Sequence, residues 1–206
     1  MRAGVVVVLV CCSSGAGARA DEPRRDDFVD LAVAAPTVAR ELRYATADNF
    51  THQVVYPAAR CLLRREVAER IARVQAALAR QKLGLKLWDC YRPLSVQRRF
   101  WSLVPDSRYV ANPAQGSRHN RGAAVDLTLV GSDGRELDMG TPFDEFSARA
   151  HRDARELGAA ATANRATLTA AMAAEGFVGL PTEWWHFDAP NWRQYPIADV
   201  PLTDTK

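Results

Sequence analysis

The sequence predicts one α+β domain in which a central antiparallel sheet is flanked by helices. Helix-like and strand-like patterns follow one another without regular alternation, which favours α+β over α/β architectures. Residues 66–81 repeat apolar side chains at helical spacing, and residues 123–130 alternate apolar and polar side chains as a strand does. Residues 21–206 are long enough for one domain with a sizeable core, and no internal repeat or linker divides them.

The first twenty residues are typical of a signal peptide. Arg2 supplies a positive start, Val5 to Cys12 is an apolar run too short to cross a bilayer, and Ala18-Arg19-Ala20 fits a cleavage site. We therefore expect a mature chain of residues 21–206, periplasmic or secreted, without a transmembrane segment. Acylation of Cys11 or Cys12 is the weaker alternative, because Val10 stands where a lipoprotein has a small residue.

Along the mature chain the first clear element is the amphipathic helix 66–81, which we expect Gly84 to end. Residues 85–88 alternate and predict a strand. Pro93 then suits the first turn of a second helix that runs to about residue 103.

A loop at 112–116 precedes the alternating strand 123–130, which we expect to be half-buried with Asp126 on its polar face. A turn at 131–134 follows. A third helix, 164–175, is closed by Gly176.

Pro181 breaks the chain before Glu183 and His186. These two residues are three apart, so they would face opposite sides of a regular strand. We expect Glu183 at the loop end and His186 inside the strand.

Charge and cysteine content narrow the class of protein. Without Arg2 and Arg19 the chain has 25 basic and 24 acidic residues, about +1, which gives no basis for a nucleic-acid or membrane-surface partner. The mature chain keeps Cys61 and Cys90, and an even pair in an exported protein favours a disulfide. Such a bond closes a loop of about 30 residues and contributes on the order of 3 kcal/mol. Two buried free thiols are the alternative, and neither cysteine has the CxxC partner of a metal site.

Two short motifs carry the chemistry. His119 and Asp126 lie in Ser-Arg-His-Asn-Arg-Gly-Ala-Ala-Val-Asp, and His186 ends Glu-Trp-Trp-His. Two imidazoles and a carboxylate form a suitable ligand set for one catalytic zinc, with the fourth position open for water. Glu183 is then available as the base that takes a proton from that water. The other histidines lack a motif partner, and we expect surface or structural roles for them: His52 and His151.

The motifs resemble those of the zinc D-alanyl-D-alanine dipeptidase family, which is related to D,D-carboxypeptidases and to the hedgehog amino-terminal domain. The hallmark Ser-x-His-x-x-Gly-x-Ala-x-Asp, followed by Glu-x-x-His, is matched throughout. Further similar segments bring the resemblance to about residues 43–195: Arg43 to Phe50, Trp88 to Pro93 and Met139 to Asp144. The resemblance implies a hedgehog/D,D-peptidase-like fold, one Zn²⁺ per chain and hydrolysis of the small substrate D-Ala-D-Ala.

The resemblance also implies roles for four further residues. Arg92 corresponds to the family's catalytic arginine and could stabilise an oxyanion; an ordinary ion pair is the alternative. Asp144 could pair with the free ammonium group of the substrate, and a helix N-cap is its alternative role. Tyr44 resembles the family's tyrosine at the same end of the substrate, and core packing is its alternative role. Ser117 corresponds to the residue near the substrate carboxylate; a hydroxyl that bonds its own turn is the alternative.

Three other functions compete with a dipeptidase. A zinc D,D-carboxypeptidase acting on peptidoglycan stem peptides needs a groove open on the amino side, and an ammonium partner such as Asp144 argues against it. A zinc-stabilised binding module has no need of Glu183 or Arg92, and both are present. A serine hydrolase is disfavoured because the chain has no Gly-x-Ser-x-Gly elbow. The sequence leaves the oligomeric state open.

Overall fold

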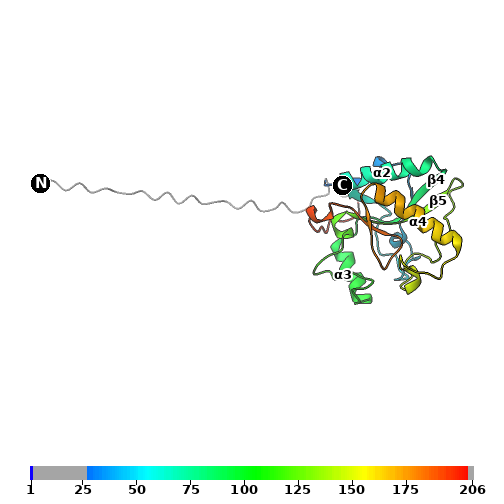
Figure 1. Ribbon diagram of the computed structural model, residues 1–206. Helices are drawn as coiled ribbons and strands as arrows, with labels where there is room; N and C mark the ends of the chain where they lie inside the picture. The colour runs from blue at the N-terminus through cyan, green and yellow to red at the C-terminus, as the bar shows by residue number, and fades with distance from the viewer. Residues whose placement is uncertain (2–26, 204–206) are drawn as a thin grey trace.

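The computed structural model describes Met1 and residues 27–203 (Figure 1). Residues 2–20 of the expected signal peptide lie outside this part of the chain. Among the described residues, none of the helices combines the length and the apolar character needed to cross a bilayer.

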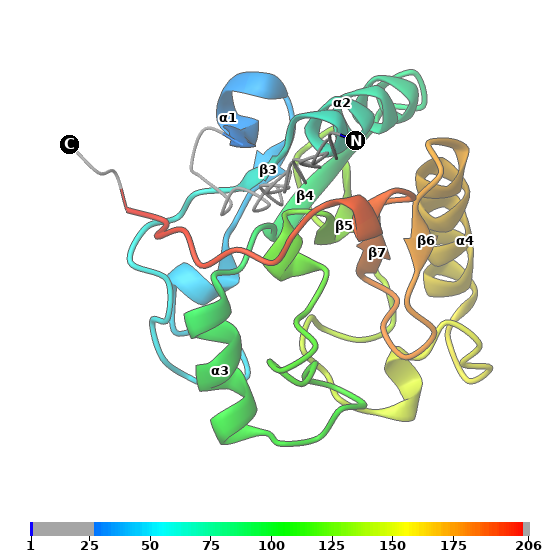
Figure 2. The ribbon, with the colours of Figure 1, turned by 90° about the vertical axis from the view of Figure 1, so that its left-hand side faces the viewer.

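A five-stranded sheet forms the centre of the fold (Figure 2). Every neighbouring pair is antiparallel except β2–β4, which is parallel. The predicted α+β fold with a central antiparallel sheet is thus confirmed, with one parallel edge strand. The order across the sheet is β2 (Ala39–Arg40), β4 (Leu83–Asp89), β5 (Ala124–Gly131), β7 (His186–Asp188) and β6 (Val178–Gly179). A separate antiparallel pair joins β1 (Phe28–Asp30) to β3 (Leu62–Arg64).

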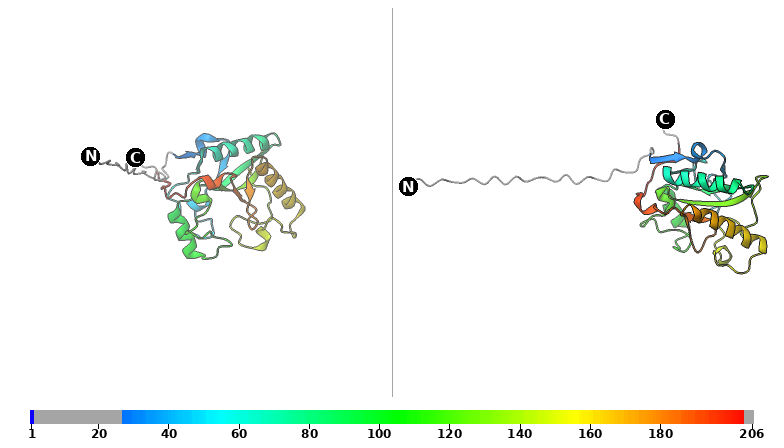
Figure 3. Two further views of the ribbon diagram at one scale, coloured as in Figure 1. Left: turned by 60° about the vertical axis from the view of Figure 1, so that its left-hand side comes forward. Right: turned by 45° about the horizontal axis from the view of Figure 1, so that its top comes forward.

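Helices α2 (Arg65–Ala79) and α4 (Ala159–Ala174) lie side by side over one face of the sheet (Figures 1 and 3). The short helix α1 (Leu31–Ala34) packs beside α2. The main core fills the space between these helices and the sheet, because one apolar face of each element turns inward. It contains Val67, Ile71, Val74 and Leu78 of α2, Leu168 and Met172 of α4, Leu85 and Leu87 of β4, and Val125, Leu127 and Leu129 of β5.

Helix α3 (Leu94–Leu103) belongs to a second, mainly aromatic core beside the first. Phe100 of α3 contacts Tyr44 of the short 3-10 helix η2 (Arg43–Ala45), with ring centroids 4.7 Å apart. Tyr56 and Tyr91 are fully buried in the same cluster. This packing attaches η2, the segment around Tyr56 and helix α3 to Tyr91, which follows the end of β4.

Two predicted boundaries are wrong. Gly84 does not end the first helix, because α2 stops at Ala79 and the chain reverses at Lys82, which has a φ of 59°. Gly84 lies inside β4, where a Cβ would come within 3.2 Å of Val130. Helix α4 begins at Ala159, five residues before the predicted start at 164. This start is not predicted from the sequence because the first turns are mostly alanine and carry no apolar periodicity.

The expectation of a half-buried strand at 123–130 is also wrong. Strand β5 is buried on both faces, and Asp126 and Thr128 are only 3% and 1% exposed. The face that carries Val125 meets the helices. The opposite face is covered by the segments that form the cavity described next.

Candidate active site

Three metal-ligating side chains meet at one point. The Nε2 atom of His119 lies 3.1 Å from Nδ1 of His186 and 3.3 Å from Oδ1 of Asp126. The same carboxylate oxygen lies 3.0 Å from Nδ1 of His186. All three side chains are buried. Atoms of these types at this spacing can hold one metal ion, so the predicted ligand set does come together as a group.

Sheet register and a tight turn create this group. Asp126 and His186 are paired directly across β5 and β7. His119 begins the 3-10 helix η3 (His119–Arg121), just before β5, and Gly122 closes the turn with a φ of 65°. A Cβ on residue 122 would lie 2.5 Å from a ring carbon of Phe28, so the turn requires glycine.

Each imidazole uses its other ring nitrogen to contact an acceptor outside the ligand group. Nδ1 of His119 lies 2.7 Å from the carbonyl oxygen of Cys90. Because a carbonyl only accepts, Nδ1 carries the hydrogen and Nε2 keeps its lone pair for a metal. Nε2 of His186 lies 2.9 Å from Oδ1 of Asp188, which leaves Nδ1 to face the metal position. Contacts of this kind commonly orient histidine ligands.

The charges in this group shift its proton affinities. Burial favours protonation of Asp126, but the charges and hydrogen bonds of His119 and His186 outweigh it and hold its pKa well below the ordinary value. Burial opposes the charge on His186, yet its hydrogen bonds to Asp126 and Asp188 raise its pKa to about 10. A metal ion that binds here must displace this proton, so its affinity is expected to fall as the pH falls.

Glu183 lies in the turn before β7, at the loop end where it was expected, while His186 opens the strand. Its side chain is buried, and Oε2 lies 3.9 Å from Nδ1 of His186. Burial, assisted by the charge of Asp126, raises the pKa of Glu183 to about 7 against the opposing effect of His186. A carboxyl group with a pKa near neutrality, close to a metal position, is suited to general base chemistry.

Arg92 is buried beside the ligand group and is held by two side chains. Its Nε and Nη2 atoms donate to Oδ2 of Asp89 at 3.1 and 2.6 Å, and Nη1 donates to Oε1 of Gln97 at 2.9 Å. Nη2 also lies 4.0 Å from Oδ2 of Asp126. Burial opposes the charge, but Asp89 outweighs it and raises the pKa of Arg92 further. The guanidinium therefore stays charged. It forms an ion pair with Asp89, which is the contact expected as the alternative to a catalytic role, and it also lies on the cavity wall.

Asp144 and Tyr44 lie together on another wall of the cavity. Oδ1 of Asp144 accepts a hydrogen bond from the Tyr44 hydroxyl at 3.1 Å, and Oδ2 accepts one from the Phe50 N–H at 3.3 Å. Asp144 has a φ of 61° in a turn and begins no helix, so the helix-cap alternative is wrong. Burial, with the charge of Asp126, raises its pKa to about 8. An incoming cation would therefore favour the ionised form of this carboxyl group.

Ser117 is buried next to His119. Its Oγ atom accepts a hydrogen bond from the His119 N–H at 3.2 Å, which is the turn contact named as its alternative. The hydroxyl hydrogen is not used in that contact and remains able to donate.

A cavity of about 300 Å³ joins these side chains. That volume is at the small end for ligand pockets, and it suits a small polar ligand. Trp185 forms part of the wall, whereas Trp184 is buried in the core and donates to Thr141. All the residues expected to hold the metal, to catalyse and to bind substrate line the cavity: Tyr44, Arg92, Ser117, His119, Asp126, Asp144, Glu183 and His186.

Sequence reasoning missed three residues that orient the site: Asp89, Gln97 and Asp188. Asp188 could have been found, because residues two apart on a strand share a face and His186 was already expected in that strand. Asp89 lies only three residues before Arg92, but the segment between them is irregular, so no helical or strand period predicts their contact; Gln97 reaches Arg92 from α3.

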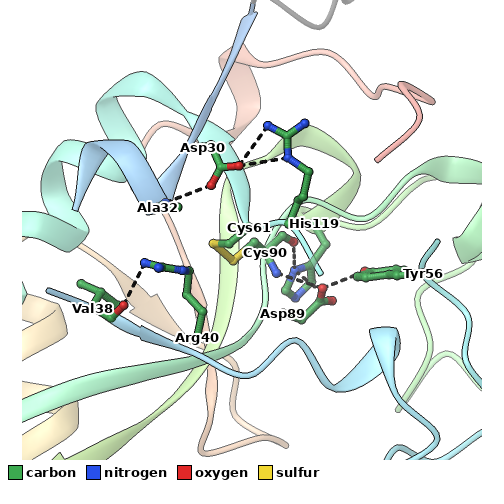
Figure 4. Close-up of a disulfide and its surroundings, with 10 residues drawn as sticks. Asp30, Ala32, Val38, Arg40, Tyr56, Cys61, Asp89, Cys90 and His119 are labelled. Carbon is green, nitrogen blue, oxygen red and sulfur yellow. Dashed lines mark hydrogen bonds and ion pairs between the residues drawn. A yellow bond between two sulfur atoms is a disulfide. The ribbon is translucent and has the colours of Figure 1, made fainter. Parts of the chain in front are cut away.

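Cys61 and Cys90 form the predicted disulfide, which lies beside this site (Figure 4). In the same view the Asp89 carboxylate and the His119 ring lie next to the bonded cysteines, and the Tyr56 hydroxyl donates to Asp89 at 2.7 Å.

Comparison with known proteins places the chain in a family. Residues 24–201 match the family described as D-ala-D-ala dipeptidase. A D-alanyl-D-alanine dipeptidase of Escherichia coli K12 is 42% identical over 171 residues, which cover 83% of this chain and 89% of that protein. Proteins of the same name from Streptomyces coelicolor and Enterococcus faecalis are 36% and 34% identical, covering 86% and 80% of this chain and 94% and 88% of those proteins. The chain therefore belongs to the D-Ala-D-Ala dipeptidase family of peptidases.

Proposed function

We propose that this chain is an exported zinc dipeptidase that hydrolyses D-alanyl-D-alanine. The observation that carries the proposal is the shared cavity, which has a metal-ligating group, a buried carboxyl group and a buried guanidinium beside it, and a further carboxyl group on its wall. The names of relatives that are 34–42% identical over most of the chain support the same substrate.

The donor set fits zinc. His119, Asp126 and His186 supply two imidazole nitrogens and one carboxylate oxygen, the combination that zinc accepts in catalytic sites. Zinc held by these residues would act as a Lewis acid: it would polarise the peptide carbonyl and make water a better nucleophile at neutral pH.

Glu183 serves as the base in this proposal. Its carboxylate takes a proton from the attacking water and later delivers that proton to the leaving amine. A pKa of about 7 allows both the acceptance and the return of the proton near neutrality.

Arg92 stabilises the negative charge that develops on the carbonyl oxygen. Its Nε and one hydrogen on each terminal nitrogen are committed to Asp89 and Gln97. A guanidinium has five N–H donors, so two remain for an oxyanion, and the rigid fork directs them before substrate arrives.

The two charged ends of the dipeptide are recognised by opposite chemistry. Asp144, supported by Tyr44, binds the ammonium group, and Ser117 donates a hydrogen bond at the carboxylate end. A buried site must provide a partner for each charge, which limits the substrate to a peptide with both ends nearby. A D,D-carboxypeptidase, the rival enzyme, needs no ammonium partner.

One set of assays separates these functions. Purified residues 21–206 are assayed with and without zinc on D-Ala-D-Ala, N-acetyl-D-Ala-D-Ala and a stem pentapeptide. We expect chelation to abolish hydrolysis, zinc to restore it, and kcat/KM to be far higher for the free dipeptide. Equal kcat/KM for the free and acetylated substrates favours the carboxypeptidase. Full activity in metal-free protein contradicts the zinc mechanism, and no hydrolysis of any substrate by zinc-loaded protein favours a binding module.

Export sets the physiological role. A secreted or periplasmic enzyme meets dipeptide released from the cell wall, whereas the cytoplasmic pool used for wall synthesis is out of reach. We therefore assign it scavenging or turnover of wall-derived dipeptide. N-terminal sequencing of the protein from the periplasm or culture medium should begin near Asp21, and an uncleaved start contradicts this localisation.

A further inference from the structure

The Cys61–Cys90 disulfide is covalently attached to the segment that orients the site. Cys90 directly follows β4 and lies between Asp89 and Arg92, and Cys61 directly precedes β3. The two cysteines are 29 residues apart in sequence, so the bond links two separate parts of the chain. Figure 4 shows the bond, the Asp89 carboxylate and the His119 ring in one cluster.

Three polar groups of residues 89–92 orient the side chains assigned to the proposed reaction. The Cys90 carbonyl accepts from Nδ1 of His119 at 2.7 Å, which fixes the nitrogen that faces the metal. The Asp89 carboxylate accepts from Arg92 at 2.6 Å and directs the guanidinium. The Arg92 backbone N–H donates to the His119 carbonyl at 3.1 Å. Displacement of Cys90 therefore moves a metal ligand and the oxyanion-binding group together.

The other end of the bond is firmly anchored. The Cys61 carbonyl accepts from the Leu31 N–H at 2.9 Å, and Leu62, next in the chain, accepts from the Tyr91 N–H at 3.0 Å. Leu63 is fully buried in the main core. The disulfide thus connects the site segment to the packed interior rather than to a surface loop.

The bond is also shielded from reagents. Cys61 and Cys90 are 1% and 0% exposed. Thiol–disulfide exchange needs direct attack on a sulfur atom, which this burial prevents in the folded protein. A reversible redox switch is therefore disfavoured, and a permanent positioning role fits better.

We propose that Cys61 and Cys90 are positioning residues for the proposed dipeptidase: their disulfide holds residues 89–92 so that His119 and Arg92 have the orientation needed for zinc binding and turnover. The inference rests on the proposed function for turnover, but its zinc-binding part stands on the geometry of the ligand group alone.

The test compares two destabilised variants of the full mature chain. Cys61→Ala/Cys90→Ala removes the bond, and Met172→Ala truncates a fully buried side chain of α4 that does not line the cavity. Loss of a disulfide and truncation of a buried methionine reduce stability by similar amounts. Zinc affinity is measured by competition with a chelator, at a temperature where both variants are folded, and kcat and KM are measured for D-Ala-D-Ala.

We expect the cysteine variant to bind zinc about tenfold more weakly, the lower end of the effect of losing a partner that orients a ligand. Its kcat should fall severalfold with little change in KM, while Met172→Ala matches the unmodified protein in all three values. Equal zinc affinity in the two variants overturns the proposal, because the bond would then act on stability alone.

Two outcomes remain to be separated. If the first variant does not fold, Cys61→Val/Cys90→Ala refills the volume of the sulfur atoms; failure of both to fold overturns the proposal, because the bond would then be needed for the fold itself. If the unmodified protein binds zinc but does not cleave D-Ala-D-Ala, the proposed function fails, while the difference in zinc affinity still tests the positioning role.

Discussion

Asp188 orients His186 in the way that the Cys90 carbonyl orients His119. The two acceptors differ in kind, because one is a charged side chain and the other a backbone atom held by a disulfide. They also occupy different ring nitrogens, Nδ1 of His119 and Nε2 of His186, so the imidazoles present Nε2 of His119 and Nδ1 of His186 to the metal position. A side-chain acceptor can be removed by substitution, so the contribution of Asp188 is directly measurable.

Substitution of Asp188 should weaken zinc binding. We expect Asp188→Ala to lower zinc affinity by about 10- to 100-fold, since His186 loses the partner that fixes its ring. Asp188→Asn keeps an acceptor oxygen and should lose less. Chelator competition measures both, with Asp153→Asn, an exposed carboxylate outside the cavity, as the control. Unchanged zinc affinity in Asp188→Ala would show that His186 is oriented by packing alone.

Substitution of Glu183 should separate zinc binding from catalysis. Glu183→Gln preserves the shape of the side chain but removes its basicity, so we expect kcat to fall at least about 100-fold. The ligand atoms come from other residues, so zinc affinity should change little. Steady-state kinetics and metal analysis of the same preparation test both points. Loss of zinc from the variant would instead make Glu183 a ligand or a residue needed for the fold.

At the scale of elements, the turn between η3 and β5 sets the distance between His119 and Asp126, two of the proposed metal ligands. Gly122 and Gly134 both have positive φ, 65° and 77°, but a Cβ would meet Phe28 only at Gly122 and has nothing within 4 Å at Gly134. A comparison of the two positions therefore isolates the steric clash from the backbone strain.

We expect Gly134→Ala to lower the free energy of unfolding by about 1–2 kcal/mol, the cost of a left-handed conformation for alanine. Gly122→Ala should cost about 1–3 kcal/mol more, because the added methyl group has no room beside Phe28. Urea denaturation measures both values. Equal losses would mean that the Phe28 ring moves aside at little cost.

Periodicity predicted the elements whose two faces meet different surroundings. Helix α2 was found within about two residues at each end because its apolar face meets the core and its charged face meets solvent. The start of α4 was missed, since alanines give no contrast between faces. Strand β5 looked half-buried because Asp126 and Thr128 are polar, yet both are buried. Alternation of apolar and polar residues shows which face of a strand is polar, not whether that face is exposed. Here the polar face of β5 is covered by the segments that form the site.

At the scale of the whole molecule, the sheet separates two layers with different requirements. The helical layer buries apolar side chains, and the spacing of apolar residues predicted its helix α2 but neither α1 nor the start of α4. The opposite layer gathers charged groups from segments as far apart as Tyr44 and His186. Short motifs predicted the residues of this layer that meet in the cavity and to which the proposed chemistry is assigned. Asp89 pairs with Arg92 in the loop after β4, and Gln97 reaches Arg92 from α3, so both contacts depend on the path of this loop, which periodicity does not predict.

The buried carboxyl group of Asp144 in this second layer should make the stability of the molecule depend on pH. Asp144 has a pKa of about 8 in the folded chain, raised first by burial and then by the charge of Asp126. The ordinary value for an unfolded aspartate is about 3.9. Below the lower value both states are protonated and the stabilising contribution is complete. As the pH rises toward about 8, the unfolded chain has lost this proton and the folded chain still holds it, so the contribution is progressively lost.

Asp144→Asn removes this titration while keeping the shape of the side chain. We expect the Tm of zinc-free unmodified protein, measured relative to that of Asp144→Asn, to fall steadily between pH 5 and pH 8 (roughly the window between the two pKa values). A saturating dipeptide should reduce the fall, because its ammonium group favours the ionised carboxylate. Calorimetry at several pH values, with and without dipeptide, measures both effects. Parallel Tm curves for the two proteins would show that Asp144 is ionised in the folded chain and that another group neutralises it.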